Sequence, residues 1–65
     1  MLYDKDIVDF LDSKKGKRAE ISDLKDYIDS LFGNVFEPNR FQKELDQLFS
    51  EGLLTCSDGI VSLRP

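Results

Sequence analysis

The shortage of cross-linking residues is what most constrains this chain, which has 65 residues, one cysteine and no histidine. A single cysteine cannot form an internal disulfide, and the ordinary ligand sets of structural zinc need histidine or several cysteines. The fold must therefore form without disulfide or metal cross-links. Apolar residues make up 40% of the sequence, including five Phe and two Tyr, which is enough for one compact core. We expect a single domain over residues 1–65, with no second lobe and no cleft between lobes.

Two segments in the first half of the chain have apolar residues at helical spacing. The first spans residues 4–13, and Gly16 is expected to end it because glycine readily adopts the left-handed conformation found after helices. Ser22 is expected to cap the second helix, and Gly33 to close it. Between the two helices, residues 17–21 form an extended segment in which residues 19–21 are expected to be a short strand.

The third helical segment is the clearest of the three. It opens at Pro38 or Asn39, because proline is favoured in a first helical turn, and it runs to Glu51 before Gly52. Phe36, which precedes it, has two alternatives, burial beneath the helices or exposure to solvent. The core positions predicted for the three helices are Tyr3, Ile7, Val8, Phe10, Leu11, Leu24, Ile28, Leu31, Phe32, Phe41, Leu45, Leu48 and Phe49.

A β-hairpin is predicted at the end of the chain, because an Asp-Gly pair between two apolar runs is a strong hairpin signal. With Asp58 and Gly59 as the two loop residues, the register is fixed. It pairs Ser57 with Ile60, Cys56 with Val61, Thr55 with Ser62 and Leu54 with Leu63. One face then packs on the helices and the other meets solvent, with Ile60 as the apolar exception on the solvent face. Cys56, on the packed face, is expected to be a small, partly buried residue rather than a reactive thiol.

The order helix, extended segment, helix, turn, helix, hairpin predicts an α+β fold that is mainly α. That order is typical of the winged-helix variant of the helix-turn-helix, in which the hairpin is the wing. The stretch from Phe41 to Leu54 resembles the junction between third helix and wing in this superfamily, above all in Glu51-Gly52-Leu53-Leu54. A three-helix winged helix with a C-terminal wing is therefore the expected fold.

Two groups of winged-helix domains from replication machinery are similar to this sequence. Residues 53–63 resemble the short final wing of the C-terminal domains of minichromosome-maintenance helicase subunits. The acidic balance resembles that of the C-terminal winged helix in the middle subunit of replication protein A. This second resemblance implies docking of partner peptides instead of reading of DNA.

The charge balance favours a protein partner over nucleic acid. The net charge is −4, from 13 acidic and 9 basic residues, so attraction to a phosphate backbone is weak over the molecule as a whole. The tip of the predicted wing has Asp58 where a DNA-bound wing usually offers Lys or Arg. We expect a protein partner to be contacted by the outer face of the third helix and by the wing, through Asn39, Arg40, Lys43, Gln47 and Ile60.

Two alternatives to protein recognition stay open. In the first, the chain is a sequence-specific DNA-binding regulator of transcription. The chain has one basic cluster, which is expected first of all to be helix-end charge on a solvated loop and otherwise to meet phosphates or an acidic partner; its members are Lys14, Lys15, Lys17 and Arg18. In the second, the chain is a small acidic inhibitor, of a phage type, whose spaced carboxylates imitate phosphates and block a nucleic-acid-acting protein.

Catalytic and membrane roles find no support in the sequence. It has no histidine base, no glycine-rich phosphate loop, no recognisable nucleophile motif and no carboxylates at metal-ligand spacing. We therefore expect a non-enzymatic binding module of replication or transcription machinery, with no catalytic residue, cofactor, metal or small-molecule substrate. Neither a bilayer-spanning apolar run nor the basic start of a signal peptide is present. An intracellular protein of the cytoplasm or nucleus, without a membrane partner, is expected.

Overall fold

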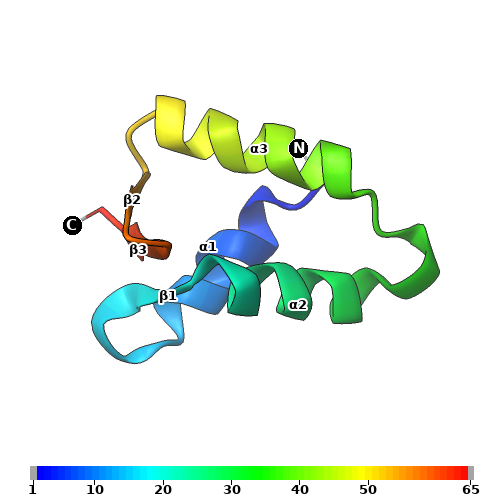
Figure 1. Cartoon of the computed structure of the whole chain (residues 1–65), viewed down its shortest axis with the longest axis horizontal. Helices are drawn as coiled ribbons and strands as arrows, with labels where there is room; N and C mark the ends of the chain where they lie inside the picture. Colours follow the sequence, from blue (N-terminus) through cyan, green and yellow to red (C-terminus); the bar gives the residue numbers. More distant parts are fainter. Residues whose placement is uncertain (1, 65) are drawn as a thin grey trace.

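The computed structural model describes residues 2–64 of the chain. Its helices are α1 (Asp4–Asp12), α2 (Ile21–Phe32) and α3 (Pro38–Ser50), with 3-10 turns η1 (Lys15–Lys17) and η2 (Gly33–Val35), and its strands are β1 (Arg18–Glu20), β2 (Leu54–Ser57) and β3 (Ile60–Leu63). In Figure 1, α1 lies between α2 and α3, both of which it contacts, and the sheet lies at one end of the helices. The predicted α+β fold, mainly helical with a C-terminal hairpin, is confirmed.

The three strands form one antiparallel sheet in the order β1-β3-β2, which makes β3 the central strand. The hairpin register is the one predicted, with Leu54 opposite Leu63 and Ser57 opposite Ile60. β1 pairs with the other side of β3 and places Ala19 opposite Val61. β1 is shifted by one residue from the expected range 19–21, and it ends at Glu20 because Ile21 already belongs to α2. Pairing across the chain therefore adds the expected third strand.

The core is a single cluster centred on the first helix. Tyr3, at the N-terminal end of α1, is fully buried, and its ring meets the edge of Phe32 with the centroids 4.7 Å apart. The Phe36 and Phe41 rings surround the same residue. Of the two alternatives for Phe36, the structure has the one in which it packs against the core. The buried cluster consists of Tyr3, Ile7, Phe10, Leu11, Leu24, Ile28, Phe41, Leu45, Leu48, Leu54 and Val61.

Gly16 and Ser22 do not mark the helix ends predicted for them, whereas Gly33 and Pro38 do. Gly16 does not end α1, because the helix already ends at Asp12, and Gly16 lies within η1 with φ +75°. Ser22 does not cap α2, which begins one residue before it. One of the free N–H groups at this end is satisfied by the sheet, because the Ile21 N–H donates to the Gly59 carbonyl at 2.9 Å. Gly33 closes α2 as expected, with φ +58°.

Two residues predicted to be buried are exposed, and Val8, a third predicted core position, is only half-buried and lies outside the core cluster. Leu31 is 52% exposed, because at this end of α2 the Tyr3 ring packs on Phe32 instead. Cys56 is exposed and not partly buried. It lies on β2, an edge strand whose outer side no other strand of residues 2–64 covers, and only Leu54 of this strand is buried. Both errors come from long-range packing that local periodicity does not report.

Truncation of the buried face of α2 tests this core. The Leu24→Ala variant leaves a cavity beside α1, and we expect it to lower the free energy of unfolding by about 2–5 kcal/mol. A chain of 65 residues has only about 3–10 kcal/mol of stability to lose. Leu31→Ala is the matched control on the same helix, with an expected effect of about 0.5 kcal/mol. Urea denaturation followed by circular dichroism measures both, and equal losses would contradict the core described here.

Candidate functional site

The exposed face of α3 presents four of the residues predicted to contact a partner. Asn39, Lys43 and Gln47 follow one another at intervals of four along the helix, and Arg40 is their neighbour. All four are exposed. The structure therefore brings these four onto one surface, as the sequence predicted for them.

Polar donors on α3 are already hydrogen-bonded to carboxylates of the same helix or its end. The Gln42 side-chain amide donates to Asp46 at 2.9 Å. One turn further on, Gln47 donates to Glu51 at 3.2 Å. Arg40 donates through Nε to Glu44 at 3.0 Å. Each of these donors thus has a carboxylate one helical turn away, at i+4.

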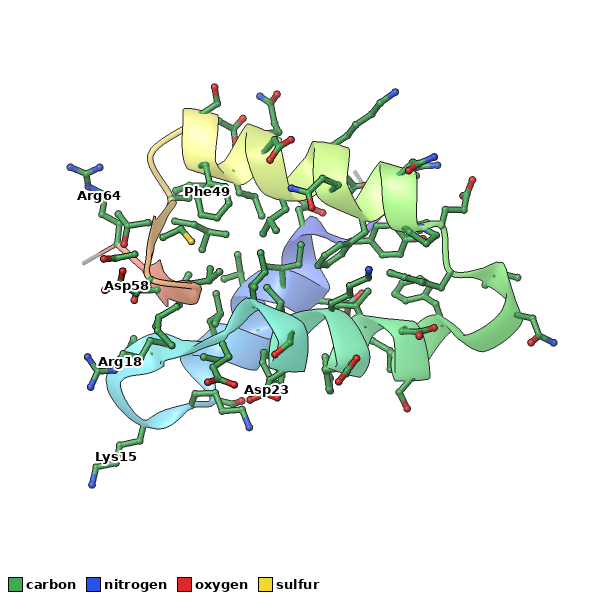
Figure 2. All side chains as sticks on the ribbon, in the orientation of Figure 1. Lys15, Arg18, Asp23, Phe49, Asp58 and Arg64 are labelled. Atoms are coloured by element: carbon green, nitrogen blue, oxygen red, sulfur yellow. The ribbon has the colours of Figure 1, made fainter. Side chains whose placement is uncertain are left out.

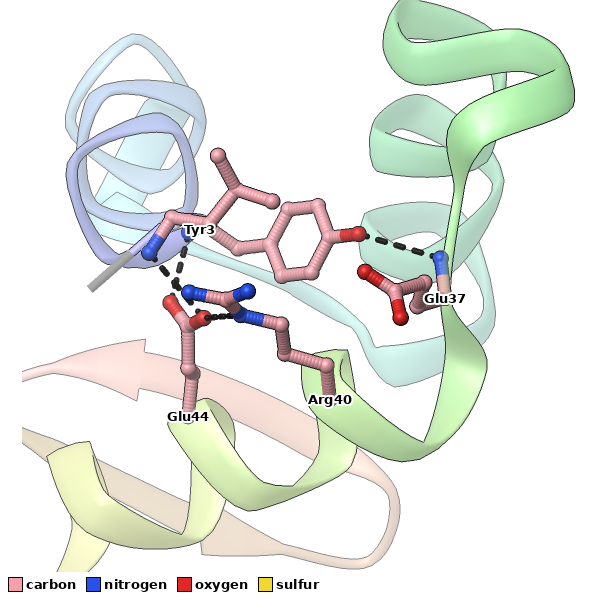
Figure 3. Close-up of polar contacts among 5 residues, drawn as sticks. Tyr3, Glu37, Arg40 and Glu44 are labelled. Atoms are coloured by element: carbon pink, nitrogen blue, oxygen red, sulfur yellow. Dashed lines mark hydrogen bonds and ion pairs between the residues drawn. The ribbon is translucent and has the colours of Figure 1, made fainter.

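The Arg40 pair belongs to a buried network that holds the start of the chain against α3 (Figure 3). Glu44 is 5% exposed, and its carboxylate accepts hydrogen bonds from the backbone N–H groups of Leu2 at 3.0 Å and Tyr3 at 2.6 Å. The Tyr3 hydroxyl in turn accepts a hydrogen bond from the Glu37 N–H at 3.0 Å. Sequence reasoning did not single out Glu44. It missed this role because nothing in the local pattern shows that the chain's second and third residues return to α3.

The surroundings of Glu44 stabilise its charged form. Burial alone raises the pKa of the carboxyl, but the hydrogen bonds from Tyr3 and Leu2, together with the hydrogen bond and positive charge of Arg40, outweigh burial. The net result is a pKa below the ordinary value of about 4.5. Arg40 therefore stabilises the fold through Glu44 and is also part of the exposed face of α3.

The predicted basic cluster divides into two pairs. Lys17 is paired with the Asp12 carboxylate, and the Lys14 ammonium lies over the Phe10 ring, 4.7 Å from its centroid. Both interactions involve residues in the last turn of α1. Lys15 and Arg18, in contrast, form no ion pair or side-chain hydrogen bond within residues 2–64. These two cations are the members of the cluster that are left for a ligand.

An open pocket covers the outer face of the sheet, away from the helices. Lys15 and Arg18 line it together with Ile60, the one predicted contact that lies outside α3. Figure 2 shows Lys15, Arg18 and Asp58 at the same end of the molecule. No residue of α3 lines this pocket. The candidate contacts therefore form two separate surfaces, one on α3 and one on the sheet.

Sequence reasoning missed three polar residues at the sheet end. Thr55 and Ser62 line the pocket beside the two free cations, and the predicted hairpin register already put both on the solvent face. Arg64 lies beside Lys14 and Lys17 around a second hollow. The missing signal was the pairing of β1 with β3, which joins the basic segment to the end of the chain.

No protein-family model, curated protein or solved structure matches this chain. Within the described residues, no group of three or more acidic or cysteine side chains lies close enough together to hold a metal ion. None of the helices in the same part of the chain has the length and apolar content needed to cross a bilayer. A functional proposal must therefore rest on the two surfaces just described.

Substitution of Glu44 tests its role as a charged anchor. We expect Glu44→Gln to lower the free energy of unfolding by about 1–3 kcal/mol at neutral pH, because the amide carries no charge and has only one acceptor oxygen. Since the folded-state pKa is below its ordinary value, this contribution is present above about pH 4.5 and is lost as the pH falls through the folded-state pKa. The difference between wild type and variant should therefore shrink in acid.

Urea denaturation at neutral and acidic pH measures this difference. The exposed Glu51→Gln is the matched control, with an expected effect of about 0.5 kcal/mol or less. A Glu44 effect that did not change with pH, or that equalled the control, would contradict the anchoring role.

Proposed function

We propose that this chain is a non-enzymatic binding module of the winged-helix type that recognises a protein partner, within replication or transcription machinery. The observation that carries the proposal is the pairing of α3's polar donors with carboxylates. Arg40, Gln42 and Gln47 each have an acidic partner at i+4. In a winged helix that reads DNA, this is the helix that enters the major groove.

Reading DNA with this helix would require two costly changes. Guanidinium and amide donors read base edges in the major groove, so they would first have to leave their carboxylates. The freed carboxylates of Asp46 and Glu51, both exposed, would then face the phosphate backbone. The hairpin tip adds the Asp58 carboxylate, and no Lys or Arg occurs among Ser57, Asp58 and Gly59. A protein surface imposes no such regular array of negative charge.

On this proposal, α3 supplies the contacts of one surface through Asn39, Arg40, Lys43 and Gln47. Their mixed donors and acceptors suit a polar protein surface, and the helix is held in place because its opposite face is buried in the core. Ile60 contributes on the second surface, at the sheet.

A DNA-binding regulator is the second candidate function, and one observation favours it. Lys15 and Arg18 have no acidic partner within the described residues, so they are available to phosphates. Against it, the pocket that they line also contains Glu20 and Asp58. Protein recognition therefore remains our proposal.

Titration of the protein into fluorescent duplex DNA of mixed sequence separates the two candidates. We expect no saturable binding at physiological salt, and at most weak binding at low salt, by fluorescence anisotropy. The double variant Asp46→Asn/Glu51→Gln removes two carboxylates from α3 and should strengthen low-salt binding. This result is expected because Gln42 and Gln47 are released and the two carboxylates that repel the phosphate backbone are gone.

The matched control is Asp23→Asn/Asp26→Asn, which makes the same charge change on the exposed side of α2. It should strengthen DNA binding less than the α3 variant does. Tight, salt-sensitive binding by the wild type, with NMR amide shifts along residues 39–50, would overturn protein recognition and make the chain a DNA reader.

A further inference from the structure

The outer face of the sheet carries two parallel rows of side chains. In the first row, Ser62 on the central strand lies between Arg18 of β1 and Thr55 of β2. In the second row, Ile60 lies between Glu20 and Ser57. The alternation of a strand puts both rows on the face opposite Val61, which is fully buried against the helices. All six residues line the open pocket.

The first row is suited to a carboxylate. Arg18 offers a planar guanidinium that binds carboxylates through two parallel hydrogen bonds, and Ser62 and Thr55 offer hydroxyl donors beside it. The Arg18 side chain runs past Gly16, with Nε 3.5 Å from where a Cβ at Gly16 would lie, so it stays close to the turn that carries Lys15. The Lys15 ammonium adds a second positive charge to the pocket. Neither cation has an acidic partner within residues 2–64.

The second row has the opposite character. Ile60 is half-buried and gives the middle of the pocket an apolar floor. Glu20 and Asp58 place negative charge at the hairpin-turn end. Along the strands, the pocket therefore changes from a cationic row at Arg18 to a row that is apolar at Ile60 and negative at Glu20, with Asp58 in the turn beyond it. The two rows are two residues apart on each strand, which corresponds to about 6.8 Å.

We propose that this face binds an extended acidic peptide segment of the partner protein. An acidic side chain of the segment meets Arg18 and Lys15, and an apolar side chain two positions away lies on Ile60. Residues i and i+2 of an extended peptide are also about 6.8 Å apart and point the same way, so their spacing matches the two rows. The inference rests on the proposed function and gives the chemistry of its partner.

Nucleic acid fits the same pocket poorly. Each strand of a duplex carries one phosphate charge for about every 3.4 Å of helix axis, and none of these charges can be left out where the pocket becomes negative. Phosphates next to those at Arg18 would meet Glu20 and Asp58. A peptide can place one carboxylate at the cationic row and an apolar or basic side chain at the other.

The test uses the full chain, labelled with ¹⁵N, and an acetylated, fluorescent peptide that contains Glu-Glu-Ser-Leu between Gly-Ser flanks. We expect amide shifts at Arg18, Thr55, Ile60 and Ser62, and binding that weakens as salt rises. The double variant Lys15→Gln/Arg18→Gln should weaken binding about tenfold or more, because charge-assisted hydrogen bonds are lost. The same peptide with Gln in place of Glu should not bind.

Lys5→Gln/Lys25→Gln is the matched control, because it removes two exposed positive charges from α1 and α2. It should leave peptide binding within about twofold of the wild type, since those charges lie outside the pocket. Unchanged amide spectra away from the substituted residues show that both variants fold.

Three results would overturn the inference: no peptide binding at low salt, equal weakening by both double variants, or shifts confined to residues 39–50. The first and third leave the proposed recognition of protein through α3 intact. Duplex DNA titrated in the same way provides the separate check on that function. If DNA shifted the pocket residues and the peptide did not, both proposals would fail.

Discussion

The burial of Tyr3 is the interaction on which the rest of this fold depends. Its ring packs against the rings of Phe32, Phe36 and Phe41. These contacts connect the start of α1 to the end of α2 and the start of α3. Its backbone N–H and hydroxyl are both hydrogen-bonded, so the buried ring leaves none of its polar groups unsatisfied. A chain with no disulfide obtains from this one residue a connection between all three helices. Aromatic pairs of this kind add stability beyond the area that they bury.

The same connection shapes the surface of α3. The Glu44 carboxylate is buried because it accepts hydrogen bonds from the N–H groups of Leu2 and Tyr3. Arg40 donates to the same carboxylate from the exposed side of α3. Arg40 is therefore not a free cation in the way that its sequence position suggests. A partner that contacts it meets a guanidinium already turned toward a carboxylate, with the outer side of the group still open to solvent. That arrangement favours a polar contact in one fixed orientation over a non-specific contact between Arg40 and phosphates.

Local signals in the sequence predicted most of the architecture. The Asp58-Gly59 pair determined the hairpin register residue by residue, and Pro38 and Gly33 marked helix ends correctly, because each of these residues acts through its own backbone preferences. The errors have a common cause. Ser22, Leu31 and Cys56 were judged from local pattern, while their actual surroundings depend on segments far away in the chain.

The candidate site was less predictable than the fold for the same reason. The contacts expected on α3 share one helix, so helical periodicity was enough to group them. Glu44 was missed, since an acid one turn from an arginine on a helix is usually a surface pair. The basic segment was recognised, but not which of its members remain free, because the neighbours of Lys14 and Lys17 became visible only in three dimensions.

The pairing of β1 with β3 turns a short hairpin into a surface that can discriminate between ligands. Without β1, the outer face of the hairpin would offer three hydroxyls and Ile60, with no charge except at its tip. β1 brings Arg18 beside Ser62 and Glu20 beside Ile60, so one added strand introduces both signs of charge in a defined order. The acidic net charge of the molecule conceals this order, since it averages over a face whose two ends differ in sign. If this face binds the proposed peptide, the local order of its charges, and not the net charge of the molecule, determines which anionic ligands fit it.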